Sequence, residues 1–211
     1  MKYTMSNYKI VNNIFSEKSV NDLYNMLNDE YFPWYFTPSI FNKNLEQPNN
    51  KRITYSPGFY HTVKHTNLGV NSNENVINNV MPILREFCDY ENLKLKEVLR
   101  IRIRKTLQYP NHINENYNVP HIDLQGYLGK YYSLIYYPED SDGDTVLFNS
   151  KKDVDGDMTH LDIINNIEGE IIRVSPKKGR AVFFKGDIVH SGNNPINYQK
   201  RIVVNYDFSL E

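Results

Sequence analysis

Two histidines, an aspartate and an arginine in the second half of the chain have types and spacings that could hold a reactive metal. His121-Ile122-Asp123 supplies two of them, His190 follows 67 positions after Asp123, and Arg201 lies eleven residues beyond His190. Two neutral imidazoles and one carboxylate can bind a divalent iron on one face and leave the opposite positions open for a bidentate acid and dioxygen. A nearby guanidinium can bind the far carboxylate of such an acid through a forked, charge-assisted pair.

A second His-x-Asp pattern, His160-Leu161-Asp162, competes with the first, so the spacing to His190 has to decide between them. The second histidine ligand should come from a distant strand, after the chain has crossed the fold several times. The 67 positions that follow the first pattern allow four strands with their turns, whereas only 28 separate the second pattern from His190. We therefore expect His121 and Asp123, rather than the second pattern, to belong to the site.

The elements that must position these residues change character near residue 98. Upstream, we expect a short strand at 8–11, a helix that begins after Ser16, and a helical stripe over 73–87 in which Pro82 either kinks the helix or starts another. Residues 31–60 contain four prolines and predict loops with at most short strands. Downstream, apolar residues recur with a period of two, which is typical of strands. Strands are expected from Val98 and around 119–124, 131–138, 144–149, 170–174, 180–185 and 200–208.

Many short strands after a helical preface predict an α+β, mainly β fold. The expected architecture is a double-stranded β-helix (jelly roll, cupin-like) with N-terminal helices packed on one sheet. We expect one domain over 1–211, in which 1–97 support a jelly-roll core at 98–208, because no repeat or linker marks a second unit.

Three arginines alternate with apolar residues at the start of the predicted core, over 99–104. Such alternation places Arg100, Arg102 and Arg104 on one face of a strand. This arginine row could line a substrate groove, but we expect it on a solvated or helix-facing side.

Composition limits the classes of function. The formal net charge is −1, so nucleic acid is an unlikely partner. Cys88 is the only cysteine, which fits a reducing compartment. The first ten residues lack the apolar core of a signal peptide, and no apolar run reaches the roughly 20 residues of a membrane span. We expect a cytoplasmic protein of the producing or host cell without a membrane partner, and nothing predicts its oligomeric state.

The motifs of the second half form an ordered set. They are His121-Ile122-Asp123, SLIYY at 133–137, DGDTVLF at 142–148, PKKGRAVFF at 176–184, His190, and RIVVN at 201–205. This succession resembles the prolyl 4-hydroxylase-like branch of the 2-oxoglutarate/Fe(II)-dependent dioxygenase superfamily, in versions found in phage and microbial genomes. The resemblance covers about residues 98–208. It departs from the family pattern at Gly143-Asp144, where two glycines are usual, and in a polar insertion at 149–169.

The resemblance implies cofactors and a role for seven residues. Fe(II), 2-oxoglutarate and O2 would be required, and ascorbate is a further candidate. His121, Asp123 and His190 would be the metal ligands and the catalytic centre. Arg201 and Tyr137 would bind the distal carboxylate of 2-oxoglutarate, Tyr109 would line the cosubstrate pocket, and Asn205 would complete its polar lining.

Three functions compete. The leading hypothesis is hydroxylation of a prolyl or other aliphatic C–H bond in a peptide or free amino acid, with release of succinate and CO2. A nucleic-acid oxidative demethylase is disfavoured, because that branch typically has an arginine six residues after the cosubstrate arginine and Asp207 stands here. A non-catalytic, metal-binding jelly-roll protein, such as a virion component, would need neither open metal positions nor Arg201.

Overall fold

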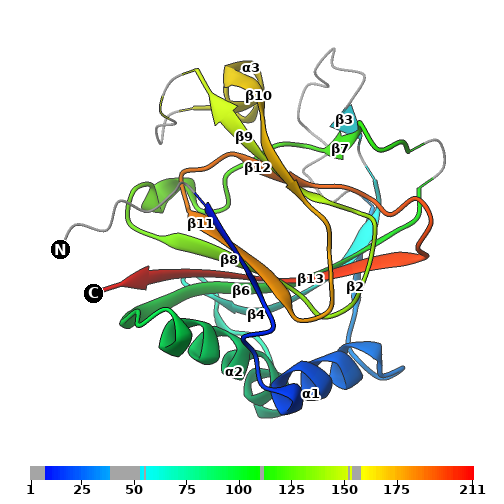
Figure 1. The fold of residues 1–211 in the computed structure, drawn as a ribbon, viewed down its shortest axis with the longest axis vertical. Helices are drawn as coiled ribbons and strands as arrows, with labels where there is room; N and C mark the ends of the chain where they lie inside the picture. Colours follow the sequence, from blue (N-terminus) through cyan, green and yellow to red (C-terminus); the bar gives the residue numbers. More distant parts are fainter. Residues whose placement is uncertain (1–7, 39–52, 55, 110–111, 152, 154–157) are drawn as a thin grey trace.

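Two β-sheets face each other, and two helices cover the outer side of the larger sheet (Figure 1). This computed structural model describes residues 8–38, 53–54, 56–109, 112–151, 153 and 158–211. Part of the predicted loop at 31–60 and part of the predicted insertion at 149–169 lie outside the described residues. None of the helices in the described residues is long and apolar enough to cross a membrane.

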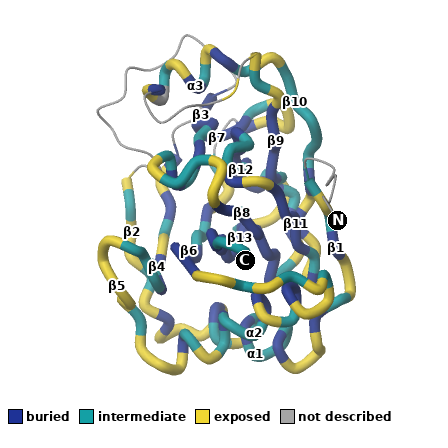
Figure 2. The backbone as a smooth tube through the Cα atoms, turned by 90° about the vertical axis from the view of Figure 1, so that its left-hand side faces the viewer, coloured by how far each residue is buried: buried dark blue, intermediate teal, exposed yellow. Residues whose placement is uncertain are grey.

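The large sheet is antiparallel throughout. Its order is β1 (Tyr8–Asn12), β11 (Arg180–Lys185), β8 (Tyr132–Tyr137), β13 (Lys200–Leu210), β6 (Leu95–Leu107), β4 (Gly58–His65) and β2 (Tyr35–Thr37), and β5 (Gly69–Val70) pairs with β4. Figure 2 shows that the strands in the middle of this sheet are mostly buried, whereas β2 and β5 at one edge carry exposed residues. The large sheet therefore has a covered centre and one open edge.

A three-stranded sheet faces the centre of the large one. It consists of β10 (Ile167–Val174), β9 (Thr145–Ser150) and β12 (His190–Gly192) in that order. Apolar side chains fill the space between the sheets, among them Leu147 of β9, Val182 of β11 and Val203 of β13. Two further short strands, β3 (Ile53–Thr54) and β7 (Tyr117–Asn118), form a parallel pair. This double-layered arrangement confirms the mainly β expectation.

Both N-terminal helices pack on the outer face of the large sheet, as expected. They are α1 (Glu17–Asn28) and α2 (Glu74–Tyr90), and their apolar faces join one core cluster with the sheet. Ser16 caps α1 by accepting from the backbone N–H of Ser19. Pro82 lies inside α2, which continues as one helix, so the alternative of two helices is wrong. The serine hydroxyl of Ser19 donates to Glu86 across 2.6 Å and thereby joins the two helices.

The predicted strands near 131–138, 144–149, 170–174, 180–185 and 200–208 correspond to β8, β9, β10, β11 and β13. The expected strand at 119–124 is not formed. Residues 121 and 190 instead make one isolated antiparallel bridge, which is followed by a 3-10 turn, η1 (Gln125–Tyr127). The eight-residue strand β4 begins at the end of the region 31–60, where prolines predicted at most short strands, and runs beyond it because its sequence after Pro57 contains no further proline.

The structure overturns the expected orientation of the arginine row. Ile101 and Ile103 of β6 face the helices, so Arg100, Arg102 and Arg104 face the small sheet. Arg100 is only 5% exposed. The alternation showed which residues share a face, but it could not show that the helices lie on the apolar side and the small sheet on the arginine side.

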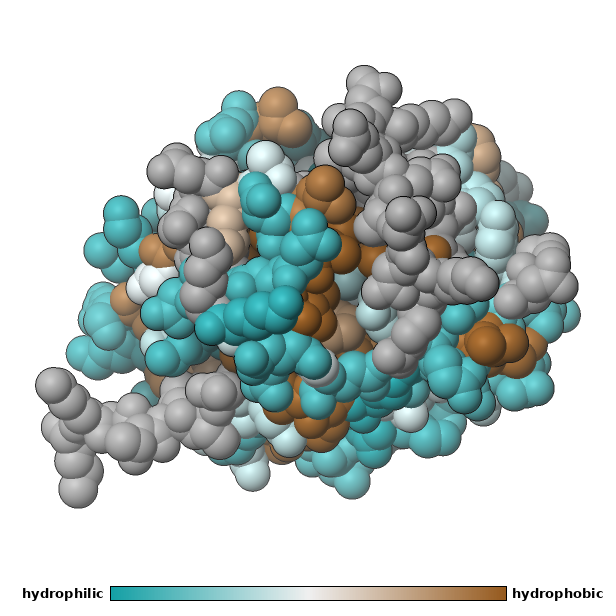
Figure 3. All heavy atoms as spheres, turned by 90° about the horizontal axis from the view of Figure 1, so that it is seen from above, coloured by the Kyte–Doolittle hydropathy of each residue, from teal (hydrophilic) through white to brown (hydrophobic). Residues whose placement is uncertain are grey.

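Seen from above, on the side of the small sheet and α3 (His160–Asn166), the described surface is mostly hydrophilic, with a strip of apolar side chains at its centre (Figure 3). Thr159 caps α3 by a reciprocal capping box with Asp162. The decoy pattern of residues 160–162 thus begins a short capped helix outside the two-sheet core, and its aspartate is used in the cap.

Candidate metal centre

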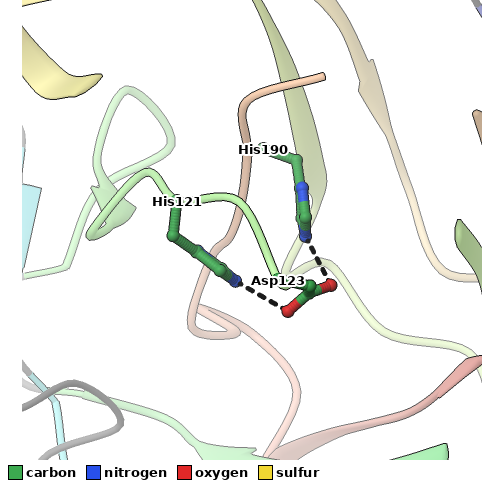
Figure 4. Close-up of side chains that lie close together, drawn as sticks. All are labelled: His121, Asp123 and His190. Carbon is green, nitrogen blue, oxygen red and sulfur yellow. Dashed lines mark ion pairs between the residues drawn. The ribbon is translucent and has the colours of Figure 1, made fainter. Parts of the chain in front are cut away.

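His121, Asp123 and His190 converge between the two sheets (Figure 4). His190 opens β12, and its backbone exchanges two hydrogen bonds with the backbone of His121, at 2.9 and 3.0 Å. His121 Nε2 lies 3.5 Å from one carboxylate oxygen of Asp123, and His190 Nε2 lies 3.2 Å from the other. A single backbone bridge therefore joins two candidate ligands, His121 and His190, that are 69 positions apart.

Both imidazoles are held so that Nε2 faces the aspartate. Nδ1 of His121 lies 3.0 Å from the carbonyl of Val119, and Nδ1 of His190 lies 3.1 Å from the carbonyl of Ile188. Because a carbonyl only accepts, each Nδ1 must carry the proton, and each Nε2 presents a lone pair. This is the arrangement in which outer hydrogen bonds orient a histidine for metal binding.

The protonation states also suit a cation. Burial and the neighbouring His190 lower the pKa of His121 to about 4, so its ring is neutral at physiological pH. Burial disfavours the charged form of Asp123, but Arg100 and the two imidazoles hold the pKa of its carboxyl well below the usual range. His121 therefore offers a neutral nitrogen beside the Asp123 carboxylate.

The distances fit one octahedral ion. Metal–nitrogen and metal–oxygen bonds of about 2.1 Å at right angles place neighbouring ligand atoms roughly 3 Å apart. The two nitrogen–oxygen separations are 3.2 and 3.5 Å, and all candidate ligand atoms lie within 4.8 Å of one another. Two imidazoles and one carboxylate on one side form the facial set that non-haem iron prefers.

Asp123 is held by two side chains from the large sheet. Arg100 of β6 forms an ion pair with one oxygen of Asp123, and the amide of Asn205 donates to the other across 2.6 Å. The same guanidinium reaches Asp207 at 2.7 Å, and Asp207 accepts a further 2.7 Å bond from the hydroxyl of Ser133. One buried arginine thus pairs with two buried carboxylates, and burial with the nearby Asp123 raises the pKa of Asp207 to about 6. This network holds the Asp123 carboxylate between the two imidazoles.

Arg201 lies in the wall of the cavity that also contains the three candidate ligands, and it has no carboxylate partner among the described residues. Its side chain is buried, one nitrogen donates to Thr145 Oγ1 across 2.8 Å, and Nε has no hydrogen-bond partner. Burial lowers the pKa of Arg201. A buried guanidinium without a counter-charge is costly, so this position calls for an anion.

Two glycines make room for the Arg201 side chain. A Cβ on Gly143 would lie 2.8 Å from Cδ of Arg201 and 2.7 Å from the carbonyl of Asn193. A Cβ on Gly192 would lie 3.0 Å from a guanidinium nitrogen of Arg201. The family pattern therefore departs at Asp144 but keeps the glycine that the close approach requires.

His121, Asp123 and His190, called the triad below, line one cavity of about 50 Å³ together with Arg201. Its other polar walls include Arg104, Thr106, Asn118, Thr145, Ser191 and Asn205. Because small-molecule sites generally exceed about 300 Å³, a five-carbon diacid can enter only if lining side chains rotate.

The remaining predicted site residues lie at different distances from this cavity. Tyr137 is fully buried and donates to Thr145 across 2.8 Å, which places it behind Arg201 rather than in the cavity wall. Tyr109 is half-buried just beyond the end of β6 and is not among the residues that line the cavity. Asn205 does line the cavity, but its amide contacts Asp123. The proposed roles of Tyr137 and Tyr109 stay predictions.

Sequence reasoning missed Arg100 and Thr145 as parts of the site. Arg100 contacts Asp123, and Thr145 joins Tyr137 to Arg201. The arginine row was visible in the sequence. The partner of Arg100 was also indicated, because Asp207 lies six residues after Arg201 and so on the same face of its strand. A buried aspartate there requires a cation opposite.

Comparison with known proteins places the fold. No family model matches the sequence, and no curated protein matches it. Solved structures do match. An oxidoreductase of the 2OG-Fe(II) oxygenase family from Burkholderia pseudomallei aligns with a TM-score of 0.62 and 11% identity, over 96% of this chain and 85% of that one. The chain has the fold of the 2OG-Fe(II) oxygenases.

Further 2OG-Fe(II) oxygenase structures agree. A prolyl hydroxylase from Trichoplax adhaerens, in complex with a peptide fragment of hypoxia inducible factor, aligns with a TM-score of 0.57 and 12% identity, over 96% of this chain and 84% of that one. The epimerase SnoN, in complex with Fe3+, alpha ketoglutarate and nogalamycin RO, gives 0.59 and 12%, over 99% and 80%. At such identities the likeness concerns the fold, which hosts different substrates.

Proposed function

We propose that the chain is an Fe(II)- and 2-oxoglutarate-dependent dioxygenase that hydroxylates an aliphatic C–H bond and releases succinate and CO2. One observation carries the proposal: a buried arginine without a carboxylate partner among the described residues shares a cavity with a His-Asp-His set. A structural metal site needs no such cation, because it has no open position for an acid to occupy.

The residues would divide the work as follows. His121, Asp123 and His190 would hold the iron through two neutral nitrogens and one carboxylate. Arg201 would bind the distal carboxylate of 2-oxoglutarate through charge-assisted hydrogen bonds. Bound iron supplies the activation of dioxygen that couples loss of CO2 from 2-oxoglutarate to oxidation of a C–H bond. The protein contributes mainly by positioning its reactants.

Thr145 would keep the Arg201 guanidinium aimed at the cosubstrate. Its hydroxyl accepts from both Tyr137 and Arg201, at 2.8 Å each. Burial raises the pKa of Tyr137 to about 12, so the phenol stays a hydrogen-bond donor at neutral pH. The chain Tyr137–Thr145–Arg201 thus fixes the guanidinium from behind, and Tyr137 would act through Thr145 unless its hydroxyl turns toward the cosubstrate.

Cosubstrate entry would require one rearrangement. Asn205 donates to Asp123 inside the small cavity, at the wall shared with Arg201 and Val203. Rotation of the Asn205 amide would free space between the triad and Arg201. Its carbonyl oxygen has no hydrogen-bond partner, so this side chain is only half satisfied where it stands.

For the substrate, we propose a prolyl or other aliphatic C–H bond in a peptide or a free amino acid. The motifs at 121–205 resemble the prolyl 4-hydroxylase-like branch, and solved structures with this fold include a prolyl hydroxylase. The demethylase alternative is weakened by Asp207, which is fully buried and paired with Arg100. We also propose a cytoplasmic setting, supported by the single cysteine of the sequence, Cys88.

The test is the cosubstrate dependence of succinate formation in an Arg201→Met variant. Loss of a charge-assisted pair should raise the 2-oxoglutarate concentration needed for half-maximal turnover by about 10- to 100-fold. Iron affinity should stay unchanged, because Arg201 does not contact the triad. Arg180→Met is the matched control, since Arg180 lies on β11 and donates to Asn12 and to the carbonyl of Ser175. Wild-type cosubstrate dependence in Arg201→Met would contradict the proposal.

A further inference from the structure

A second, larger cavity of about 310 Å³ adjoins the candidate metal centre. The two cavities share Arg104 and Thr106, so a ligand in the larger one could extend along Arg104 toward the triad. Small-molecule sites begin at about 300 Å³, and the second cavity reaches that size. Nothing in the proposed roles of the triad and Arg201 uses it.

The walls of this cavity come from the open side of the large sheet. Strands β2, β4 and β6 contribute Thr37, Tyr60, Thr62, Arg102, Arg104 and Thr106 to it. The register explains this wall, because Tyr60 pairs with Arg104 and Thr62 pairs with Arg102 across β4 and β6. Paired residues point to the same face of a sheet, and this is the face of β6 that carries Arg100 beside the triad.

Arg102 forms no ion pair with a carboxylate of the described residues, although Asp123 and Asp207 lie near enough to favour its charge. Its Nε is buried without a hydrogen-bond partner, and its guanidinium carbon lies 5.9 Å from the centre of the Tyr60 ring. Burial and the neighbouring Arg100 lower the pKa of Arg102, and Asp123, Tyr60 and Asp207 only partly oppose this shift. Arg100, two residues away on the same strand, is by contrast balanced by Asp123 and Asp207.

The same strand therefore holds one arginine that is neutralised internally and one that faces a ligand-sized cavity. A cation left in this position is stabilised when an anion enters and forms charge-assisted hydrogen bonds with it. The Tyr60 ring offers an apolar face beside the cation, and Thr62 offers a hydroxyl. Together these groups suit the anionic end of an organic molecule with some apolar surface.

We propose that the second cavity is the substrate subsite and that it binds a small organic anion, with Arg102 holding the anionic group. This inference rests on the proposed oxygenase function and concerns the class of molecule that carries the C–H bond. The carboxylate or phosphate would lie at Arg102, and the carbon skeleton would pass Arg104 toward the iron. Fixing one end of the molecule in this way selects which C–H bond reaches the metal.

The experiment measures binding of matched probes to the Fe(II)-loaded protein under anaerobic conditions, with 2-oxoglutarate at saturation so that Arg201 is occupied. Benzoate and phenyl phosphate represent the two anions, and benzamide is the neutral analogue of benzoate. Binding is followed by calorimetry and by the change in the visible charge-transfer band. We expect both anions, or one of them, to bind at least about tenfold more tightly than benzamide, the effect of one charge-assisted hydrogen bond. The anion that binds more tightly shows whether the subsite prefers a carboxylate or a phosphate.

Arg102→Met should remove this preference and leave the charge-transfer band of iron and 2-oxoglutarate intact. Lys105→Met is the matched control, because Lys105 lies on the same strand and contacts Trp34 with its ammonium 4.1 Å from the ring. It should keep the preference for anions. Equal binding of benzamide and both anions to the wild type would overturn the inference, and so would an unchanged preference in Arg102→Met.

Three outcomes distinguish failure of this inference from failure of the proposed function. If Arg102→Met weakens binding of 2-oxoglutarate instead of the probes, the cavity serves the cosubstrate and the inference is wrong. If the wild type gives no charge-transfer band at all, the oxygenase proposal fails first. A wild type that gives the band but shows no preference for anions refutes the substrate subsite alone.

Discussion

The two faces of the large sheet differ in chemistry where they are built from the same strands, β6 and β13. On the face toward the helices, Ile101, Ile103 and Tyr206 join a continuous apolar core. On the face toward the small sheet, the alternating neighbours are charged or polar, and Arg100 is balanced by Asp123 and Asp207. Where β6 pairs with the second half of β13, apolar packing and charged groups therefore lie on opposite faces of one sheet, whereas β8 and β11 also pack apolar side chains toward the small sheet.

This separation has an energetic consequence. Apolar burial contributes about 25 cal/mol per Å² and is not directional, so the helix face can be large and tightly packed. Buried charges contribute little to stability and are costly when unpaired. Arg201 is buried and Arg102 is half-buried with a buried Nε, and neither forms an ion pair with a carboxylate of the described residues. We infer that these unpaired charges are retained, despite their energetic cost, because the face toward the small sheet binds anions and a cation.

The largest expected effect is on iron affinity and comes from removing a metal ligand on the face toward the small sheet, called the charged face below. His190→Ala should weaken Fe(II) binding by more than the roughly 100-fold that loss of an outer partner of a metal site costs. The fold should persist, because the apolar core lies mainly on the other face. Metal affinity is measured by competition with a chelator, and folding by circular dichroism.

The matched control for His190→Ala is His160→Ala, which changes the decoy pattern at the start of α3. It should retain wild-type iron affinity. Loss of iron binding in His160→Ala, or its retention in His190→Ala, would reverse the choice between the two His-x-Asp patterns.

A pair of substitutions on one strand sharpens the contrast in stability. Ile103→Ala removes a fully buried side chain from the helix face and should lower the free energy of unfolding by about 2–5 kcal/mol. Arg102→Met, one position away on the other face, should change it by less than about 1 kcal/mol, because no ion pair is lost. Chemical denaturation of the metal-free protein measures both. Equal losses would mean that the two faces are not separated in the way described.

Gly143 connects the charged face with the loop before β9. Gly143→Ala should displace Arg201 and weaken 2-oxoglutarate binding, with a stability cost of about 1–3 kcal/mol from overpacking. Gly169→Ala is the control, because nothing lies within 4 Å of its added Cβ. Calorimetric titration with 2-oxoglutarate and thermal unfolding would compare the two, and identical behaviour would argue against the close packing of Gly143 on Arg201.

The smallest expected effect is the pH dependence of stability that comes from the protonation of His121. His121 should titrate near pH 4 in the metal-free protein, because burial and His190 lower its pKa from 6.5. Its neutral ring then contributes stability that is fully present above pH 6.5 and is lost as the pH falls through 4. Side-chain NMR of the histidines measures the midpoint. A midpoint near 6.5 would show that the ring is more open to water than the structure indicates.

Much of the fold was predictable because periodicity reports local structure. Ser16 marked the start of α1, and period-two stretches located β8, β9, β11 and β13. What could not be predicted is which side of a strand faces which layer. The alternation over 99–104 fits either orientation, and only the positions of the helices and the small sheet decide that the arginines turn inward.

The site was predictable where residue type and order suffice. His121, Asp123 and His190 lie close enough to hold one ion, and Arg201 lines the same cavity, while their roles stay predictions. The contacts that hold them depend on register, which the sequence does not show: Asp207 lies opposite Arg100, and Asn205 opposite Arg102. The residues at 119–124 form a bridge rather than a strand, because a single pair of backbone hydrogen bonds suffices to join the two histidines.

The most direct test of the charged face as an iron and 2-oxoglutarate site is an anaerobic titration of the purified protein with Fe(II) and then 2-oxoglutarate. A visible metal-to-ligand charge-transfer band should appear only when both are present, and admission of air should yield succinate. No band, with iron shown not to bind, would contradict this account and leave the likeness to the oxygenases as one of fold alone.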